Sequence, residues 1–291
     1  MIQIKNKLLN PKIDYVFKRI FGYSGNEDIT KNFLSSIISD PITEIKLNCN
    51  PVTEKDLFDD KIGILDIKAK LNNNINCNIE MQIVDNNNIE KRLLFYWSKM
   101  YTSSIKVGNN YTDLEKCIVI LISDYNLDNL KTLPEYFTKW NIREEKHSKI
   151  ILTDVMEVYI IELRKFKEAI RKDSNILNSW LQFINNPEVI SKMENKEIKK
   201  AKKVLEEISQ DEREQYLSEL RQKYIMDQNA IHSHGYDKGL EAGIKQGFEK
   251  GVQQNRFEIA QKMLSENLDF STIIKITGLT EEEINKIKSK K

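Results

Sequence analysis

Hydrophobic and polar residues alternate along two neighbouring stretches in the first third of the chain. Over residues 65–71 and 75–83 the odd positions are apolar and the even positions are mostly polar. A period of two is typical of half-buried strands, and the three asparagines between the stretches favour a β-hairpin. With a three-residue turn centred on Asn73, residue i pairs with residue 146 − i, as Leu65 does with Met81. A two-residue turn would mix the polar and apolar faces, so the register is well specified.

Apolar residues three and four positions apart predict helices on both sides of this hairpin. The first helix is expected to begin at Asn10, a capping residue followed by Pro11, and to end at Gly22. The other expected elements are a helix over 26–39, a strand over 42–47, a helix over 89–106, buried strands over 117–122 and 157–163, and helices from about 170 onward. The order α, α, β, β, β, α, β indicates an α/β domain followed by a helical C-terminal region.

Glycine recurs every fourth residue between Gly235 and Gly251. Each glycine within a helix costs about 1 kcal/mol relative to alanine, so a lone helix would not easily tolerate the series. Either a partner backbone packs along the glycine row, or the segment is a partly disordered repeat expansion. We favour the first, with a second copy or a partner helix docking on residues 235–251. The intervening Lys, Glu and Gln residues exclude a membrane-spanning role for the repeat.

The last part of the chain has the outline of a helix-turn-helix. Over residues 270–284 the pattern predicts a helix, a turn that contains glycine, and a second helix capped by Thr280 with Glu283 at its third position. The second helix begins with acidic residues and becomes basic only from Lys286 onward. We therefore favour a small packing motif over a DNA-reading element.

The charge of the chain cancels almost completely, with 45 Lys and Arg against 44 Asp and Glu. The cancellation is not local: residues 1–24 and 61–107 carry net charges of +4 and +3, whereas residues 25–60 carry −5. Basic surface beside the hairpin suits nucleic acid, because phosphate contacts supply most non-specific affinity. No apolar run is long enough for a membrane span, and three widely spaced cysteines predict free thiols in a reducing cytoplasm.

The hairpin register places Asp66 opposite Glu80, with Gln82 one step along on the same face. Two carboxylates facing each other across a strand pair lie about 5 Å apart at Cβ and repel each other. A divalent cation such as Mg²⁺ removes the repulsion and keeps coordination positions for water and phosphate. The alternative is a solvated face on which Lys68 and Lys70 balance the two acids. The hairpin alone leaves both interpretations open.

Four blocks of sequence, in order, carry a resemblance to a known family. They are Asn10–Gly22, Ile64–Lys70, Ile79–Gln82 and Lys91–Tyr101. Together they resemble the Rpn family of recombination-promoting nucleases, also called PD-(D/E)XK family transposases, over roughly residues 8–230. The resemblance implies a restriction-endonuclease-like αβββαβ core. The domains then expected are a nuclease core over 1–165, a helical extension over 166–230, and the glycine-spaced tail with the helix-turn-helix-like motif over 231–291.

By this resemblance, Asp66 and Glu80 are expected to ligate Mg²⁺, or another divalent cation such as Mn²⁺ or Ca²⁺. Gln82 stands where the superfamily more often has a lysine that orients the attacking water. Glutamine can hydrogen-bond to that water but adds no positive charge. Asp14, on the first helix, is a further catalytic candidate, and the alternative for it is a first-turn acid that the helix dipole stabilises.

Three further residues are candidates for contact with the substrate. Lys68, on the same face as the two carboxylates, could bring a cation to a phosphate, or it could be their solvated partner. Arg92 and Tyr96 follow the hairpin and belong to the last of the four blocks. For Tyr96 we favour core packing over a contact with substrate.

The activity implied is that of a Mg²⁺-dependent DNA endonuclease, an enzyme that hydrolyses phosphodiester bonds in DNA recombination, transposition or defence against mobile DNA. One alternative is a catalytically weak DNA-binding or regulatory protein that retains the nuclease fold, because Gln82 replaces the usual lysine. Another is a ribonuclease that uses the same site. Nothing in the sequence identifies a cleavage-site preference.

Overall fold

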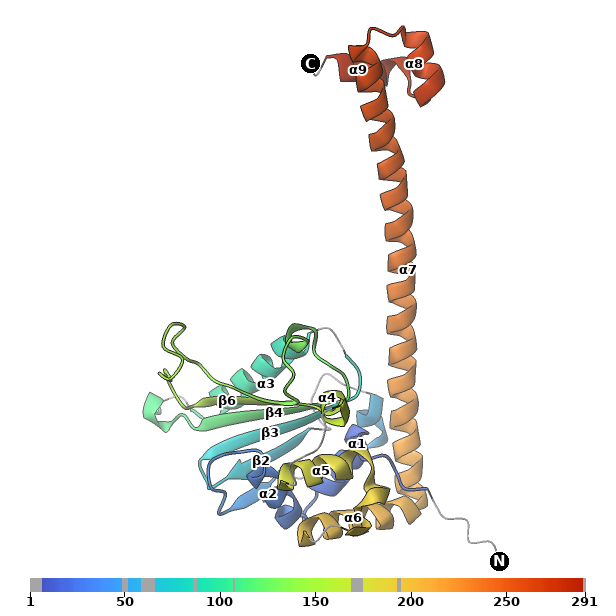
Figure 1. The fold of residues 1–291 in the computed structure, drawn as a ribbon. Coiled ribbons are helices and arrows are strands. Elements are labelled where there is room, and N and C mark those ends of the chain that lie inside the picture. Colours follow the sequence, from blue (N-terminus) through green and yellow to red (C-terminus); the bar gives the residue numbers. More distant parts are fainter. Residues whose placement is uncertain are drawn as a thin grey trace, which may run out of the picture. The chain divides into compact units, whose positions relative to one another are not determined.

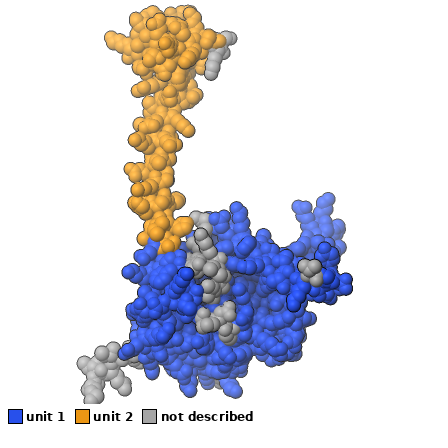
Figure 2. Space-filling view, turned by 180° about the vertical axis from the view of Figure 1, so that it is seen from behind, with its two compact units in different colours: residues 1–227 blue, residues 228–291 orange. Residues whose placement is uncertain are grey.

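The computed structural model describes residues 7–48, 52–58, 66–85, 88–106, 108–168, 175–192 and 195–289. The chain divides into two compact units, residues 1–227 and 228–291, which Figure 2 shows in different colours. We call them the core unit and the C-terminal unit. The division expected from the sequence, with boundaries near 165 and 230, stays a prediction.

The described residues of the core unit form a six-stranded mixed sheet (Figure 1). Its strands, in spatial order, are β1 (Ile45–Leu47), β2 (Ile67–Leu71), β3 (Ile75–Gln82), β4 (Lys116–Ser123), β6 (Met156–Glu162) and β5 (Phe137–Trp140). The first three are antiparallel, β3, β4 and β6 are parallel, and β5 runs antiparallel to β6 at the edge. The sheet follows the predicted order of elements, with β5 as an addition that the sequence pattern did not predict.

The hairpin of β2 and β3 has the predicted register. Ile67 pairs with Ile79 and Leu71 pairs with Ile75, which leaves a three-residue turn. Asn72 and Asn73 both adopt positive φ angles, 50° and 63°, and asparagine tolerates this left-handed conformation better than most residues. Leu65 lies outside the described residues, so its pairing with Met81 stays a prediction.

Helices cover both faces of the sheet. On one face lie α1 (Asp14–Phe21), α2 (Glu27–Ser35), α5 (Ile176–Asn185) and α6 (Lys196–Gln210), and on the other lies α3 (Ile89–Ser103) (Figure 1). Along β4, Ile118 and Ile120 pack in the first layer, whereas Val119 and Leu121 pack under α3. Burial on both faces explains why β4 reads as an unbroken apolar run. A short helix, α4 (Leu163–Glu168), follows β6 directly.

Three helix boundaries differ from the prediction by three residues or more, and the end of α3, at Ser103 and not at 106, is one of them. The first helix begins at Asp14 and not at Asn10, because the Asn10 side chain accepts a hydrogen bond from the Lys12 amide and closes a turn ahead of the helix. It ends at Gly22, as predicted. The second helix stops at Ser35 and not near 39, and the Ser36 hydroxyl donates to the Phe33 carbonyl in the turn that follows.

The chain continues into α7 (Glu212–Ser265), which from Gln228 onward belongs to the C-terminal unit together with α8 (Phe270–Thr277) and α9 (Glu281–Lys288). Four fully or nearly fully buried residues, Ala260, Ile273, Leu279 and Ile284, form the small core of this unit. Gly278 ends α8 with φ of 68°, and Thr280 and Glu283 form the predicted capping box. No helix in the described part of the chain has both the length and the apolar content needed to cross a membrane.

Candidate active site

The site is built around the two carboxylates that the hairpin brings together. Asp66 and Glu80 come one step beyond the last pair of the β2–β3 ladder, Ile67 with Ile79. Glu80 is fully buried, whereas Asp66 is partly exposed. Although part of the Asp66 residue is exposed, desolvation of its carboxyl group, followed by the charge of Glu80, raises the pKa of Asp66, and desolvation also raises the pKa of Glu80. Both shifts mean that this pair binds protons more tightly than isolated carboxylates do.

The two oxygens of Glu80 have different environments. Oε1 accepts a hydrogen bond from Gln82 Nε2 at 2.7 Å and another from the guanidinium of Arg92 on α3. Oε2 is buried and has no hydrogen-bond partner among the residues that the structure describes. An unsatisfied buried carboxylate oxygen costs free energy, so Oε2 is an atom of this site at which a bound proton or cation would be favourable.

Asn78 is a member of the site that the sequence analysis did not identify. Its Nδ2 lies 3.4 Å from Asp66 Oδ2, while its Oδ1 is buried without a hydrogen-bond partner in the described part of the chain. Asn78 lies two positions before Glu80, on the same face of β3, and this spacing was the available signal. The site therefore offers carboxylate and amide oxygens, the donor set that a hard divalent cation such as Mg²⁺ prefers.

The acidic residues of the site are few. Within the described ranges, no group of three or more His, Cys, Asp or Glu side chains has an arrangement that could hold a metal ion. A cation in this site would therefore need the Asn78 amide oxygen, water or the substrate to complete its coordination. Mg²⁺ usually keeps several waters and binds through one or two carboxylates. The donors present therefore fit such an ion.

Asp14 lies near this pair but is engaged in an ion pair. Arg221 of α7 donates to both of its carboxylate oxygens, with Nη2 at 2.6 Å from Oδ2 and Nε at 3.0 Å from Oδ1. The same guanidinium donates to the Leu57 carbonyl. The negative charge of Asp14 still contributes to raising the pKa of Glu80. A role for Asp14 as a metal ligand stays a prediction.

Arg92 and Tyr96 lie one turn apart on α3. The Arg92 guanidinium is 5.6 Å from the centre of the Tyr96 ring and at the same time binds Glu80. Tyr96 is only partly buried and belongs to neither hydrophobic core cluster of the core unit. Core packing was the role we favoured for Tyr96, but the ring instead lines the pocket described next.

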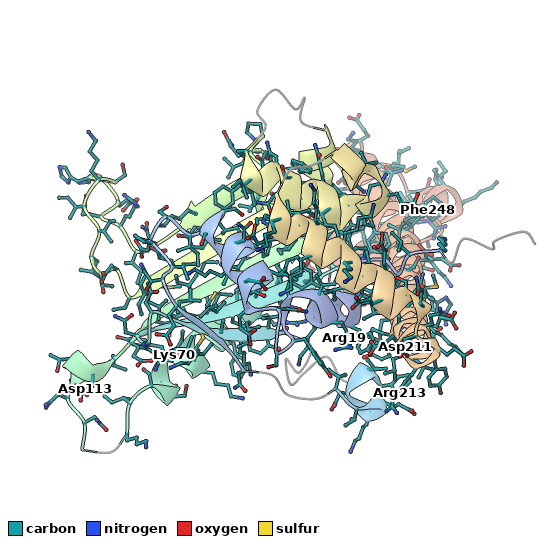
Figure 3. All side chains as sticks on the ribbon, turned by 90° about the horizontal axis from the view of Figure 1, so that it is seen from below. Arg19, Lys70, Asp113, Asp211, Arg213 and Phe248 are labelled. Carbon is teal, nitrogen blue, oxygen red and sulfur yellow. The ribbon has the colours of Figure 1, made fainter. Side chains whose placement is uncertain are left out.

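A pocket of about 550 Å³ opens beside Asp66, Asn78 and Tyr96. Four lysines contribute to its lining: Lys46, Lys68, Lys70 and Lys99. Lys70, labelled in Figure 3, forms a 2.7 Å ion pair with Glu115, and Lys46 lies 3.3 Å from Glu44. The charge of Lys68 opposes the rise in the pKa of Asp66. The pocket thus combines a carboxylate, an aromatic ring and several cations.

A second region of the core unit ties α1 to the start of α7. Arg19 forms a 2.8 Å ion pair with Glu214 in the first turn of α7, and Figure 3 labels Arg19 together with Asp211 and Arg213, the residues on either side of the start of that helix. Together with the pair of Asp14 and Arg221, this contact fixes the first turns of α7 against α1. These two ion pairs therefore stabilise the position of α1, the helix that carries Asp14.

Two protein families match this chain. The model of the PD-(D/E)XK nuclease family transposase matches residues 11–234, and the model of the C-terminal HTH domain of the Rpn/YhgA-like nuclease family matches residues 253–289. The second match identifies as an HTH domain the segment for which we favoured a packing motif. Comparison with curated proteins and with solved structures gave no match. Since the first match spans well over half of the sequence, this chain belongs to the PD-(D/E)XK nuclease family of transposases, with an Rpn-type C-terminal domain.

Proposed function

We propose that this chain is a Mg²⁺-dependent DNA endonuclease that hydrolyses phosphodiester bonds. The observation that carries the proposal is the buried Glu80 carboxylate, whose Oε2 has no partner in the described residues, beside a second carboxylate with a raised pKa. A divalent cation would satisfy that oxygen and remove the repulsion between the two acids. Membership of a nuclease family supports nuclease chemistry for this chain.

Asp66 and Glu80 would hold the cation, with Asn78 Oδ1 as an additional donor, and Mn²⁺ or Ca²⁺ could take its place. When bound, such an ion polarises the phosphate and lowers the pKa of a bound water. Gln82 uses its Nε2 to hold Glu80, which leaves its own carbonyl oxygen to accept a hydrogen bond from the attacking water. Gln82 therefore orients the water but cannot accept its proton at neutral pH.

Arg92 would supply the positive charge that Gln82 does not bring. Its guanidinium binds Glu80 Oε1 and stacks near Tyr96, so the charge is held at the site by two contacts. A fixed cation stabilises the charge that develops on the phosphate during attack. Lys68 and Tyr96, which line the pocket, would contact the phosphate and an adjacent base or sugar.

The HTH domain would give the enzyme a second contact with DNA. Its acidic second helix is poorly suited to read base edges, so we assign it a supporting role in DNA binding. In the cell, the activity would serve recombination, transposition or defence against mobile DNA. Residues 235–251 stay a candidate helix for self-association.

The decisive experiment is plasmid nicking by the full chain in Mg²⁺ and in EDTA, with Asp66→Ala compared with the control Glu135→Ala. Glu135 is an exposed carboxylate outside the site. We expect nicking in Mg²⁺ by wild type and Glu135→Ala, and none by Asp66→Ala or in EDTA. Equal nicking by wild type and Asp66→Ala, with both folded by circular dichroism, would refute the proposal.

One observation favours a second candidate function. Gln82 occupies the usual lysine position, and a site without that lysine could bind a cation without cutting. Retained DNA binding with no turnover in Mg²⁺, Mn²⁺ or Ca²⁺ would favour such a regulatory protein. Labelled DNA and RNA of the same sequence, tested side by side, would separate a deoxyribonuclease from a ribonuclease.

A further inference from the structure

A row of large apolar side chains runs along the exposed surface of α7. Tyr236, Leu240, Ile244 and Phe248 are spaced by four residues and are 72, 51, 64 and 73 % exposed. A shallow depression lies between this row and the neighbouring row that contains Asp237 and Lys245. Single exposed apolar side chains occur on any protein surface, but four large ones spaced by four residues along a charged helix need a further explanation.

Each apolar residue directly follows a glycine of the spaced series. At all five positions, from Gly235 to Gly251, an added Cβ would meet no atom within 4 Å in the described part of the chain. The glycines are therefore not required by packing within this chain, although each costs the helix about 1 kcal/mol. They leave a flat strip of backbone beside the apolar row, and a partner helix can approach such a strip closely.

We propose that residues 235–252 pair with the same segment of a second copy of this chain, with the two helices antiparallel. A two-fold pair that brings residue i to the level of residue 487 − i places Leu240 at Gly247 of the other copy and Ile244 at Gly243. The same register continues outward with Tyr236 at the level of Gly251. Each large side chain thus comes to the level of a glycine, and the two-fold axis makes every contact occur twice.

The charges along α7 favour this orientation. In the antiparallel register, Asp237 comes to the level of Lys250 and Lys238 to the level of Glu249. Parallel helices in register would instead bring each charge to the level of the identical charge, which is repulsive. These pairs lie toward the ends of the contact, so they act as a longer-range attraction that physiological salt screens over about 8 Å.

Neighbouring registers are less favourable. A shift of one repeat in one direction brings Lys238 to the level of Lys245, and a shift in the other direction leaves Lys250 with Glu241 as the one opposite-charge pair. A row spaced by four residues also drifts by about 40° around the helix at each repeat. Rows of this kind pack at a crossing angle near −50°, so contact concentrates around Leu240, Gly243, Ile244 and Gly247.

The test is the mass of the full chain in solution by light scattering over a concentration series. We expect wild type to approach twice the 34.2 kDa chain mass at high concentration. Gly247→Leu should remain monomeric, because the new side chain occupies the strip on which Leu240 packs. The control Ala242→Leu adds a comparable bulk on the opposite side of α7 and should still dimerise. Leucine has higher helix propensity than glycine, so loss of dimer without loss of helicity excludes unfolding.

Charge exchange tests the orientation. Asp237→Lys should weaken the dimer, and the double variant with Lys250→Asp should restore it, because the exchanged pair again attracts. Parallel pairing predicts no rescue, since like charges stay together. A wild type that is monomeric throughout, a Gly247→Leu variant that still dimerises, or a failed rescue would each overturn the proposal. Nuclease activity is not used as a readout, so the result is independent of the proposed function.

Discussion

The hairpin of the core unit and the apolar row of α7 are unfavourable for opposite reasons, because the hairpin buries a charged group and α7 exposes apolar side chains. At the hairpin, the carboxylate of Glu80 is buried with one oxygen unsatisfied among the described residues. Along α7, large apolar side chains are exposed beside glycines that weaken the helix. Each arrangement costs stability in the isolated chain, and each cost is recovered only when something binds. The chemistry of the buried or exposed group is the basis for the binder that we propose in each region, a cation in the first and an apolar helix surface in the second.

The largest effect is expected from Asp66→Asn, a change that should move activity and stability in opposite directions. Loss of one carboxylate should lower nicking by at least about 100-fold, the scale found when a group that stabilises a transition state is removed. It also removes a like-charge pair, so without metal the melting temperature at pH 8 should rise by about 2–4 °C. Calorimetry in EDTA measures the second effect.

Glu135→Gln is the matched control for this change, because it neutralises an exposed carboxylate of the same unit. It should leave both nicking and melting temperature unchanged. If Asp66→Asn instead lowered the melting temperature in EDTA, Asp66 would act as a structural partner and not as half of a repelling pair. The hairpin would then no longer be an example of an arrangement that costs stability until a ligand binds.

A second prediction concerns the charge on Arg92. Arg92→Gln should lower nicking by about 100-fold, because Gln82 offers no cation to replace the guanidinium. Adding Gln82→Lys to this variant should restore part of the activity, since a lysine at that position brings the charge back beside Glu80. The neighbouring exposed cation provides the control, and Lys91→Gln should nick as wild type does. No rescue by Gln82→Lys would show that Arg92 acts by shape or hydrogen bonding and not by charge.

The third prediction follows from the raised pKa values of Asp66 and Glu80. Without metal, the folded protein holds protons on this pair that the unfolded chain would release, so the pair contributes most to stability at low pH. That contribution is lost as pH rises from the ordinary carboxyl pKa, about 4, through the raised pKa of Asp66, about 8. Mg²⁺ must displace these protons, so the increase in melting temperature that it causes should grow over the same range.

Differential scanning fluorimetry between pH 5.5 and pH 8.5, with and without Mg²⁺, measures this dependence. In Asp66→Asn the Mg²⁺-induced shift should be small and nearly independent of pH. A wild-type shift that stays constant across the range would mean that the cation binds away from the carboxylate pair.

How far the sequence predicts these two regions depends on the range of the contacts involved. The hairpin register was predictable because alternation and the turn at Asn73 are local, and they fix the position of Asp66 relative to Glu80. The pairing of Asp14 with Arg221 was not, since 207 residues separate the partners and no periodic pattern links them. Asn78 shares the face of Glu80, but an asparagine on a strand carries no signal of its own until its neighbours are known.

The edge strand β5 shows a different limit. Its four residues pair with one neighbouring strand, β6, and their pattern is too short to distinguish a strand from a loop. The start of α1 was misplaced because the Asn10 side chain can cap a turn as well as a helix. The glycine series lies within the helix α7, as the favoured interpretation requires, while the association of that helix with a partner stays a prediction.

The smallest effect is expected from Gly247→Ala, and it bears directly on the second region. In the monomer, alanine should stabilise α7 by about 1 kcal/mol, because glycine pays more backbone entropy in a helix. In the pair, the added methyl group reaches the strip on which Leu240 of the other copy packs, so part of that gain should disappear. Thermal melting followed by circular dichroism should therefore show a higher melting temperature for Gly247→Ala than for wild type, and this difference should shrink as protein concentration rises. Gln246→Ala, which lies off the glycine row, should show no such dependence. If the increase for Gly247→Ala were the same at every concentration, no partner would cover the row, and the parallel between α7 and the proposed metal site would no longer hold.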